Sequence, residues 1–594
     1  MLSEDANPAG PEHAEDAAPY PLRMIEASVS AFSGKVAVRD GRVTLSYERL
    51  WQEAGDLSAV LQAKGVEGAH VGVYLRRTAS LVVAMLAIWR AGGVYVPVDP
   101  AFPRNRLQFM AQDAGLAAVI AGPEDLDVAG SFAPQVFSVE NSTPVDSPTA
   151  GRHTREAYLL YTSGSSGRPK GVIVSHAALG AFLSSLSARI ALTPDDRVAA
   201  LTTPSFDISF LELIWPLTVG AEVVIADPET AIEGRRLGAF LDQHGITLMQ
   251  GTPATWRLLM QVGWSGRPEM RALCGGEALP PPLASDLQGR VAELWNMYGP
   301  TETTIWASCG LIDRSDDIHV GPPLEGWEIS VMDSSGQVAA PGEEGEVIIA
   351  GEGLADGYWQ RPTETSTAFV TWSDGKSPQR RVYRTGDRGA FDEHGRLVIF
   401  GRRDDQVKVR GYRIELAEIE LALERHAEII EAAVQLQTNG VDEPMLVAYP
   451  VFPSAPVSTS ELRAFLQRDL PDYMIPQAFV PLEALPLTAN GKRDRAALPL
   501  FIGGPTHDEA SPIQTDPLAV LIQTCREVLP VQTITADDNF FDLGGQSLQA
   551  AQMLALFEAR AGLTFPLRAA LSGTLGSLVA IARPVAGMDA EPVA

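Results

Sequence analysis

The chain has 594 residues, 45% of them apolar, and a formal net charge of −28 at pH 7. This length predicts several domains, since one domain takes roughly 150 residues, and the acidic balance argues against nucleic-acid binding, which needs a basic surface. No apolar run approaches the roughly 18 residues of a membrane span, and the acidic N-terminus lacks the basic region of a signal peptide. The three cysteines lie far apart in the sequence, so we expect no disulfide framework and no cysteine metal site, and a cytoplasmic location fits.

The first residues predict a tail followed by a folded body. Residues 1–18 contain five carboxylates and no Lys or Arg, which indicates disorder. A globular pattern begins at about Pro19. Residues 87–100, AIWRAGGVYVPVDP, predict a helix that ends at a glycine pair and a buried strand that ends at Pro97.

Residues 161–171, YTSGSSGRPKG, predict a loop between two strands, 157–160 and 171–176. Backbone N–H groups and hydroxyls of such a loop can surround phosphate oxygens, and Lys170 can add positive charge. The loop departs from the GxxxxGK[ST] pattern, because Pro169 precedes the lysine and Gly171 follows it. A flexible surface loop is the alternative interpretation.

Further motifs follow in a fixed order: FDIS (206–209), NMYGPTETT (296–304), YRTGDRG (383–389) and GRRDDQVKVRGYR (401–413). With the loop and LSYERL (45–50), they resemble the motifs of adenylate-forming enzymes, the superfamily of acyl-CoA ligases, luciferases and adenylation domains of nonribosomal peptide synthetases. The resemblance implies a multidomain α/β fold. Residues 19–402 would form a large subdomain of mixed sheets and helices, and residues 403–500 a small α+β subdomain.

The resemblance also implies ATP and Mg²⁺ as cofactors. Asn296 and Tyr298 would hydrogen-bond to and stack on adenine, Thr301 would touch the α-phosphate, and Asp387 would accept both ribose hydroxyls. Glu302 would hold Mg²⁺, which prefers carboxylate oxygen. The implied nucleotide-binding residues are Thr162, Ser163, Gly164, Ser165, Ser166, Gly167, Lys170, Asn296, Tyr298, Thr301, Asp387 and Arg402.

Asp207 of FDIS indicates an amino-acid substrate. A carboxylate at the mouth of an apolar pocket is costly unless it meets a cation, and an α-ammonium group is one. The resemblance implies this role, and makes Phe206 an aromatic gate beside the ATP site. The alternative is a helix N-cap aspartate.

The remaining pocket residues are carried over from the resemblance, and several are bulky. Such a lining predicts a very small amino acid, and the set resembles that of glycine-activating domains. Alanine or another small amino acid is the alternative, because apolar pockets reject a methylene by only about 1–3 kcal/mol. Gly251 is an alternative to its neighbour Gln250. The predicted lining is Asp207, Phe206, Ile208, Leu211, Gln250, Leu273, Gly275, Met297, Ile305 and Trp306.

The small subdomain carries two implied catalytic lysines. Lys492 would bridge the substrate carboxylate and the α-phosphate, although a lone lysine in a glycine turn is usually only solvated. Lys408, with Gly411, would line the tunnel for a thiol. Asp404 stands at the position that the family uses as its hinge.

Residues 501–515 predict a linker, and residues 516–583 an all-α four-helix carrier bundle that begins at an Asp516 N-cap. FFDLGGQSL (540–548) resembles the attachment motif of peptidyl carrier proteins, which implies 4'-phosphopantetheine on Ser547. Gln546 stands where the family usually has His or Asp, so partner preference stays open. Residues 584–594 predict a second tail.

The resemblance thus implies a two-domain peptide-synthetase unit that loads a small amino acid onto its own carrier. A phosphopantetheinyl transferase and a downstream condensation or tailoring enzyme in trans are the expected partners, and an MbtH-like protein assists some relatives. A free-standing acyl-CoA ligase is one rival, against which Asp207 and the carrier domain argue. An inactive site with the carrier as a docking scaffold is the other. The residues that argue against it are Lys170, Glu302, Asp387 and Lys492.

Overall fold

The computed structural model describes most of the chain, namely residues 20–140, 154–374, 378–438, 444–454, 456–486, 493–501, 516–529 and 534–585 without Asp542, Gly544, Gln546 and Ser572. The predicted tail 1–18, Lys492, and nearly all of the predicted linker and second tail lie outside these residues. Within the described part, no helix combines the length and the hydropathy that crossing a membrane requires.

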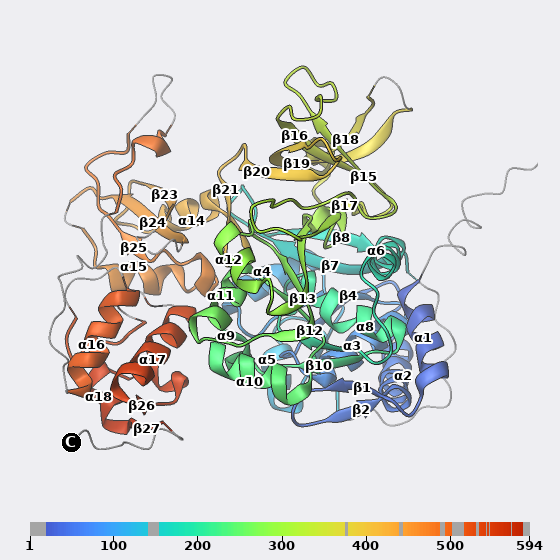
Figure 1. Cartoon of the computed structure of the whole chain (residues 1–594), viewed down its shortest axis with the longest axis horizontal. Coiled ribbons are helices and arrows are strands. Elements are labelled where there is room, and N and C mark those ends of the chain that lie inside the picture. The colour runs from blue at the N-terminus through green and yellow to red at the C-terminus, as the bar shows by residue number, and fades with distance from the viewer. Residues whose placement is uncertain are drawn as a thin grey trace, which may run out of the picture.

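Two sheets with helices around them form the large body, coloured blue to green in Figure 1. The seven-stranded sheet runs, in order, β17 (Gly357–Tyr358), β8 (Lys170–Ser175), β7 (Glu156–Thr162), β4 (Val94–Pro97), β3 (His70–Tyr74), β5 (Ala118–Ala121), β6 (Gln135–Ser138). The eight-stranded sheet runs β14 (Ser308–Leu311), β13 (Val291–Tyr298), β12 (Arg267–Gly275), β11 (Leu248–Gly251), β9 (Arg197–Ala200), β10 (Glu222–Ile225), β1 (Val36–Arg39), β2 (Thr44–Ser46).

A third, antiparallel sheet stands beside these two, at the top of Figure 1. Its strands are β15 (Trp327–Met332), β16 (Gly345–Gly351), β19 (Arg380–Phe391) and β18 (Phe369–Trp372), with β20 (Leu397–Arg402) on β19. The helical segments of the large body are α1 (Pro21–Phe32), α2 (Tyr47–Ala63), α3 (Ala79–Arg90), α4 (Arg104–Ala114), η2 (Pro123–Asp125), α5 (Leu126–Ala129), α6 (His176–Arg189), α7 (Ile208–Leu213), α8 (Trp215–Val219), α9 (Pro228–Ile232), α10 (Gly234–His244), α11 (Pro253–Gln261), α12 (Pro281–Leu287), η3 (Thr301–Thr303) and α13 (Pro362–Ala368).

The small subdomain has a core of its own, separate from that of the large body. As predicted, one face of α14 supplies Leu416, Ile419 and Leu423 to this core, and Ser458 caps α15 by accepting from the Glu461 N–H. Its elements are β21 (Gln406–Val409), β22 (Tyr412–Glu415), α14 (Leu416–Leu423), β23 (Glu431–Thr438), β24 (Pro444–Val451), α15 (Thr459–Leu466), η4 (Asp472–Met474), β25 (Ala478–Phe479) and η5 (Arg495–Ala497).

The last domain is mainly helical and also has its own core. Asp516 caps its first helix, as predicted, by accepting from the Leu518 N–H. The elements are α16 (Pro517–Val528), α17 (Ser547–Ala561), η6 (Leu567–Leu571) and α18 (Leu575–Ile581), with a short pair of strands, β26 (Leu563–Thr564) and β27 (Arg583–Pro584). The predicted fold class, α/β with a small α+β subdomain and an all-α carrier, is confirmed.

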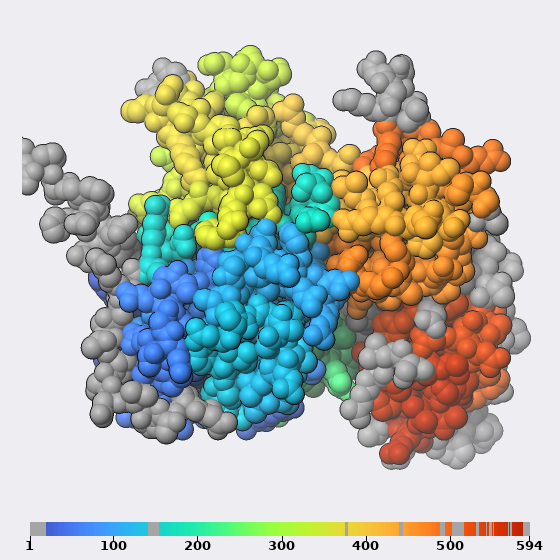
Figure 2. Space-filling view, turned by 180° about the vertical axis from the view of Figure 1, so that it is seen from behind, coloured from blue at the N-terminus to red at the C-terminus, as the bar shows by residue number. Residues whose placement is uncertain are grey.

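The small subdomain and the carrier domain lie one above the other along one side of the large body, orange and red in Figure 2. The carrier contacts the large body through α17, which packs against α9. Among the described residues, an ion pair also joins them, with Arg235 Nη1 2.7 Å from Glu558 Oε2.

Candidate active site

The site lies where parallel strands of the eight-stranded sheet end. Strands β11, β12 and β13 run parallel, with Gly251 opposite Cys274 and Gly275 opposite Met297, so their carboxyl ends share one edge. Ligands of open α/β sheets usually bind at this edge. The loop after β7 reaches it from the neighbouring sheet.

The predicted phosphate loop, residues 163–169, closes the antiparallel pair β7–β8, in which Thr162 lies opposite Lys170. Ser163, Gly164 and Gly167 are buried in it, whereas Ser165 and Ser166 are exposed. Lys170 points inward, with its Nζ 4.2 Å from the ring centre of Tyr358 and 4.0 Å from Glu302 Oε1. Burial, and then the nearby Arg413, lower the pKa of Lys170.

Glu302 is the buried carboxylate at the centre of the phosphate side. Its Oε1 accepts the Tyr358 hydroxyl at 2.7 Å, and its Oε2 lies 2.7 Å from Arg413 Nη1. Burial alone would raise its pKa, but Arg413 and Lys170 lower the pKa to about 2, so the group is ionised. Among the described residues, no group of three or more His, Cys, Asp or Glu side chains is placed to hold a metal ion. Mg²⁺ is commonly held by one carboxylate together with substrate phosphates, and Glu302 fits that ligand set.

The residues predicted to hold the nucleoside are also brought together. Asp387 accepts the Tyr298 hydroxyl on Oδ2 at 2.6 Å and Arg402 Nη1 on Oδ1 at 2.8 Å. Arg402 turns its other N–H groups to Asp404, with two contacts of 2.7 Å. The Asn296 side-chain amide donates to the His319 carbonyl at 3.0 Å. The predicted hinge residue is thus tied to the predicted ribose-binding carboxylate through one arginine.

Asp207 is buried, and its Oδ2 has no hydrogen-bond partner among the residues that the structure describes. It stands at the N-cap position of α7, and its side chain makes no capping hydrogen bond there. Burial raises its pKa to about 6, against the opposing effect of the Thr301 hydroxyl. A buried, incompletely satisfied carboxylate favours a cationic ligand.

A cavity of about 70 Å³ connects the two sides. Of the predicted amino-acid pocket, Asp207, Phe206, Ile208, Ile305 and Trp306 line it. Tyr412 and Tyr473 pack edge-on against Phe206, with ring centres 4.8 and 6.4 Å away.

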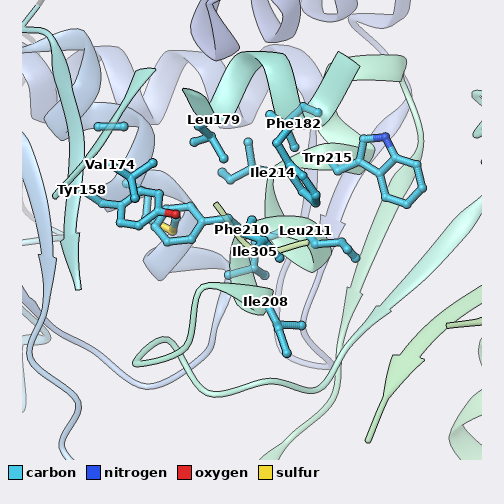
Figure 3. Close-up of a cluster of buried hydrophobic side chains, with 14 of the residues drawn as sticks. Tyr158, Val174, Leu179, Phe182, Ile208, Phe210, Leu211, Ile214, Trp215 and Ile305 are labelled. Atoms are coloured by element: carbon cyan, nitrogen blue, oxygen red, sulfur yellow. The ribbon is translucent and has the colours of Figure 1, made fainter. Parts of the chain in front are cut away.

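The other predicted pocket residues stand behind this lining. A Cβ on Gly275 would lie 2.7 Å from Trp306 Cη2 and 2.9 Å from Met297 Cβ, so glycine lets the indole lie against the strand. Leu211 and Leu273 belong to the fully buried apolar cluster, and Figure 3 shows Leu211 inside that cluster with Ile208 at its edge. The Gln250 side chain donates to the Gly251 carbonyl at 3.1 Å.

The backbone that presents Trp306 is strained. Thr304 and Ile305 have φ values of 61° and 67°, and a β-branched residue is rarely found there. The Thr304 hydroxyl holds this bend by donating to the Gly353 carbonyl at 2.7 Å. Such strain persists where surrounding structure enforces it, commonly at functional sites.

The hairpin β21–β22 of the small subdomain reaches into the site. Arg410 and Gly411 form its two-residue turn, with φ values of 54° and 83°, and the Gly411 N–H donates to Glu277 Oε1 at 2.8 Å. Lys408 lines the cavity, 5.9 Å from the ring centre of Tyr298, and burial lowers its pKa. The structure therefore places Lys408 and Gly411 in the lining of the cavity, and their part in a thiol tunnel stays a prediction.

Tyr358, Arg413 and Glu418 are among the side chains of the site that were not singled out from the sequence. Arg413 lies directly across the hairpin from Lys408. Two cations opposite one another repel unless they face anions. The basic residues of VKVRGYR that pair across the hairpin were therefore the available sequence signal for an anion near Arg413. For Tyr358 and Glu418 the sequence held no comparable signal.

Ser547 begins helix α17, and its side chain is not among the described ones. The preceding Gly545 packs closely on Phe540, since a Cβ there would lie 2.0 Å from the ring. Helix α17 therefore begins within the predicted attachment motif.

The fold and the matching family models define the chain as an adenylate-forming enzyme with a phosphopantetheine attachment domain. The family described as AMP-binding enzyme matches residues 25–359, more than half of the chain, and the chain belongs to this family. The AMP-binding enzyme C-terminal domain matches residues 418–492, and the phosphopantetheine attachment site matches residues 519–582.

The chain is similar to nonribosomal peptide synthetases. It is 37% identical over 545 residues to a dimodular nonribosomal peptide synthase of Bacillus subtilis (strain 168), covering 90% of this chain but only 23% of that protein. Among solved structures, holo-PA1221, which contains adenylation and PCP domains, is 27% identical with a TM-score of 0.80, covering 95% of this chain and 96% of that one. The four-domain synthetase holo-AB3403, bound to AMP and glycine, is 37% identical with a TM-score of 0.62, covering 94% and 42%.

Proposed function

We propose that the chain activates glycine with MgATP and loads it onto its own carrier domain. In the first step, a carboxylate oxygen of glycine bonds to the α-phosphorus of ATP, and pyrophosphate leaves. In the second step, a thiol loses its proton, its sulfur bonds to the carbonyl carbon of the adenylate, and AMP leaves. Phosphopantetheine on Ser547 supplies that thiol when it is attached.

The proposal rests on the buried Asp207 carboxylate and on the bulky side chains beside it, which we call the wall of the pocket. Its unpartnered Oδ2 can accept hydrogen bonds from an α-ammonium group. Trp306 and Ile305 fill the adjoining space, and the strained bend at Thr304 fixes the indole there. A substrate with no side chain satisfies Asp207 without displacing this wall. The glycine bound to holo-AB3403, a four-domain relative of which this chain covers 42%, agrees with this.

One set of residues binds the amino acid, and another binds the nucleotide and its phosphates. Asp207 orients the amino acid, and Asp387, Tyr298 and Asn296 receive the nucleoside. Glu302 holds Mg²⁺, while the phosphate loop with Lys170 binds the phosphates. Lys492 would stand between the substrate carboxylate and the α-phosphate, where a cation lowers the repulsion between two anions.

Domain bounds and partners belong to the same proposal. We place the large subdomain at residues 19–402, the small one at 403–500 and the carrier at 516–583, with Asp404 as the hinge. A phosphopantetheinyl transferase modifies Ser547, and a downstream condensation or tailoring enzyme takes up the product.

The proposal is tested by ATP–pyrophosphate exchange across a panel of amino acids, with and without a co-expressed MbtH-like protein. We expect exchange with glycine, weaker exchange with alanine, and a large loss in Lys492→Ala. Preference for a large side chain would overturn the crowded-pocket argument. Robust exchange in Lys492→Ala would show that this lysine is not part of the mechanism. No exchange with any amino acid would contradict the role assigned to Asp207.

A further inference from the structure

One short segment, residues 302–306, carries groups for both substrates. It begins with Glu302, the carboxylate proposed to hold Mg²⁺, and it ends with Ile305 and Trp306, which line the cavity. Within it, the backbone is left-handed at Thr304 and Ile305, with φ values of 61° and 67°. This conformation is an outlier for a β-branched residue, so it lasts only where neighbouring groups hold it.

Two side-chain hydrogen bonds hold the strained part of this segment. The Trp327 indole N–H donates to the Thr303 carbonyl at 3.1 Å. The Thr304 hydroxyl donates to the Gly353 carbonyl at 2.7 Å. Both bonds are buried, and a buried group that loses its partner carries the full cost of its desolvation. The two bonds therefore oppose relaxation of the left-handed bend.

Trp327 is itself fixed in position. It begins strand β15 of the third sheet, and its ring packs edge-on against Phe182, with ring centres 6.4 Å apart. Phe182 belongs to the apolar cluster that also holds Ile305 (Figure 3). A Cβ on Gly353 would overlap the Trp327 ring, so glycine at this position leaves room for the indole. The indole N–H is thus a rigidly placed donor.

We propose that Trp327 and Thr304 determine the size of the amino-acid pocket, although neither side chain lines the cavity. They act as positioning residues, because they hold the bend that presents the Trp306 indole to the pocket. Gly275 stands behind this indole, where a Cβ would lie 2.7 Å from Trp306 Cη2. The indole is therefore confined by the strand behind it and by the two hydrogen bonds along the chain. The inference rests on the proposed function, in which this indole limits the substrate to glycine.

A relaxed bend would let the indole move away from the substrate and leave space for a methyl group. Apolar pockets discriminate against one methylene by about 10–200-fold. The quantity to measure is therefore the ratio of kcat/KM for glycine to kcat/KM for alanine, which we call the glycine ratio. A smaller fraction of folded enzyme lowers both values together, so it leaves the glycine ratio unchanged.

ATP–pyrophosphate exchange by the full-length chain measures the glycine ratio. Trp327→Phe removes the indole N–H and keeps an aromatic ring, so we expect the ratio to fall by about five-fold or more. The KM for MgATP should not change, since the Glu302 carbonyl keeps its hydrogen bond from the Ala355 N–H at 2.9 Å. Trp372→Phe is the matched control, because the Trp372 indole, in the same sheet, also donates to a backbone carbonyl at 3.1 Å, that of Gly336. This control should keep the wild-type ratio.

A second pair of variants tests the other hydrogen bond. Thr304→Val removes the hydroxyl and keeps the branched side chain, so the glycine ratio should fall as it does in Trp327→Phe. Thr304→Ser keeps the hydroxyl and should keep the wild-type ratio. Wild-type ratios in both Trp327→Phe and Thr304→Val would overturn the inference, and so would a fall of equal size in the control Trp372→Phe.

The result is separable from the proposed function. Exchange that favours glycine in the wild type, combined with an unchanged glycine ratio in Trp327→Phe and Thr304→Val, would contradict this inference alone. A wild-type preference for a large side chain, or no exchange with any amino acid, would contradict the proposed function and this inference with it.

Discussion

Replacing Asp207 with asparagine should stabilise the protein while it abolishes amino-acid activation. Burial raises the pKa of Asp207 from 3.8 to about 6. A difference of about two pKa units corresponds to about 3 kcal/mol, at 1.36 kcal/mol per unit. Because the folded-state pKa is the higher one, the folded protein binds the proton more tightly than the unfolded chain. The stability due to this group is therefore complete below pH 3.8 and is lost as the pH rises through 6.

Asparagine at position 207 carries no charge, so the variant does not lose this stability as the pH rises. At pH 8 we expect Asp207→Asn to raise the melting temperature of the large body by about 3–6 °C, and at pH 4.5 the gain should largely vanish. Glycine-dependent pyrophosphate exchange should fall by about 100-fold or more, since the ammonium loses its buried counter-charge. Thermal unfolding followed by tryptophan fluorescence at both pH values, together with the exchange assay, measures both effects.

Asp196→Asn is the control for this experiment. Asp196 is also partly buried, but Thr247 and the backbone N–H of Thr193 lower its pKa despite burial, and Arg271 pairs with it at 2.5 Å. Its replacement should lower the melting temperature at pH 8. A melting temperature of Asp207→Asn that is lower than that of the wild type at pH 8 would refute the argument that Asp207 is held without a sufficient partner.

Three further changes test separate parts of the site. Trp306→Ala removes the indole that lies against Gly275, so pyrophosphate exchange across the amino-acid panel should shift from glycine toward larger side chains; an unchanged preference would show that the indole does not limit the pocket. Ser547→Ala should abolish loading of radiolabelled glycine onto the chain and leave pyrophosphate exchange intact, and loading of this variant would contradict the attachment site. Arg235→Glu turns the ion pair with Glu558 into a repulsion. A partly exposed pair contributes about 0–1 kcal/mol, so the loading rate should fall a few-fold and recover in the double variant with Glu558→Arg. No recovery in the double variant would mean that the contact does not guide docking of the carrier.

The local features of the fold were predictable because each depends on a few neighbouring residues. The caps at Ser458 and Asp516 and the strand that ends at Pro97 follow from turn and capping chemistry. The motifs also indicated which distant residues would meet. Lys170 does approach Glu302, and Tyr298 does approach Asp387.

The contacts of the small subdomain could not be obtained in this way. Arg413 and Glu302 are 111 positions apart, and Gly164 and Glu418 are 254 apart. These contacts depend on where one rigid body rests on another, and the sequence pattern of each body is compatible with other placements. The left-handed backbone at Ile305 was hidden for a related reason, because a β-branched residue argues against that conformation unless the surroundings impose it.

The two-residue turn of the hairpin β21–β22 restricts how this segment can vary in length. Side chains alternate between the faces of a strand, and the turn at Arg410 and Gly411 fixes which pairs stand opposite. Inserting or deleting a single residue would send either Lys408 or Arg413 to the opposite face, and a longer turn would meet Thr252, which lies against Gly411. Most surface loops tolerate insertions. In this hairpin, however, a change in the length of the turn also changes the strand register, so the two must be kept together.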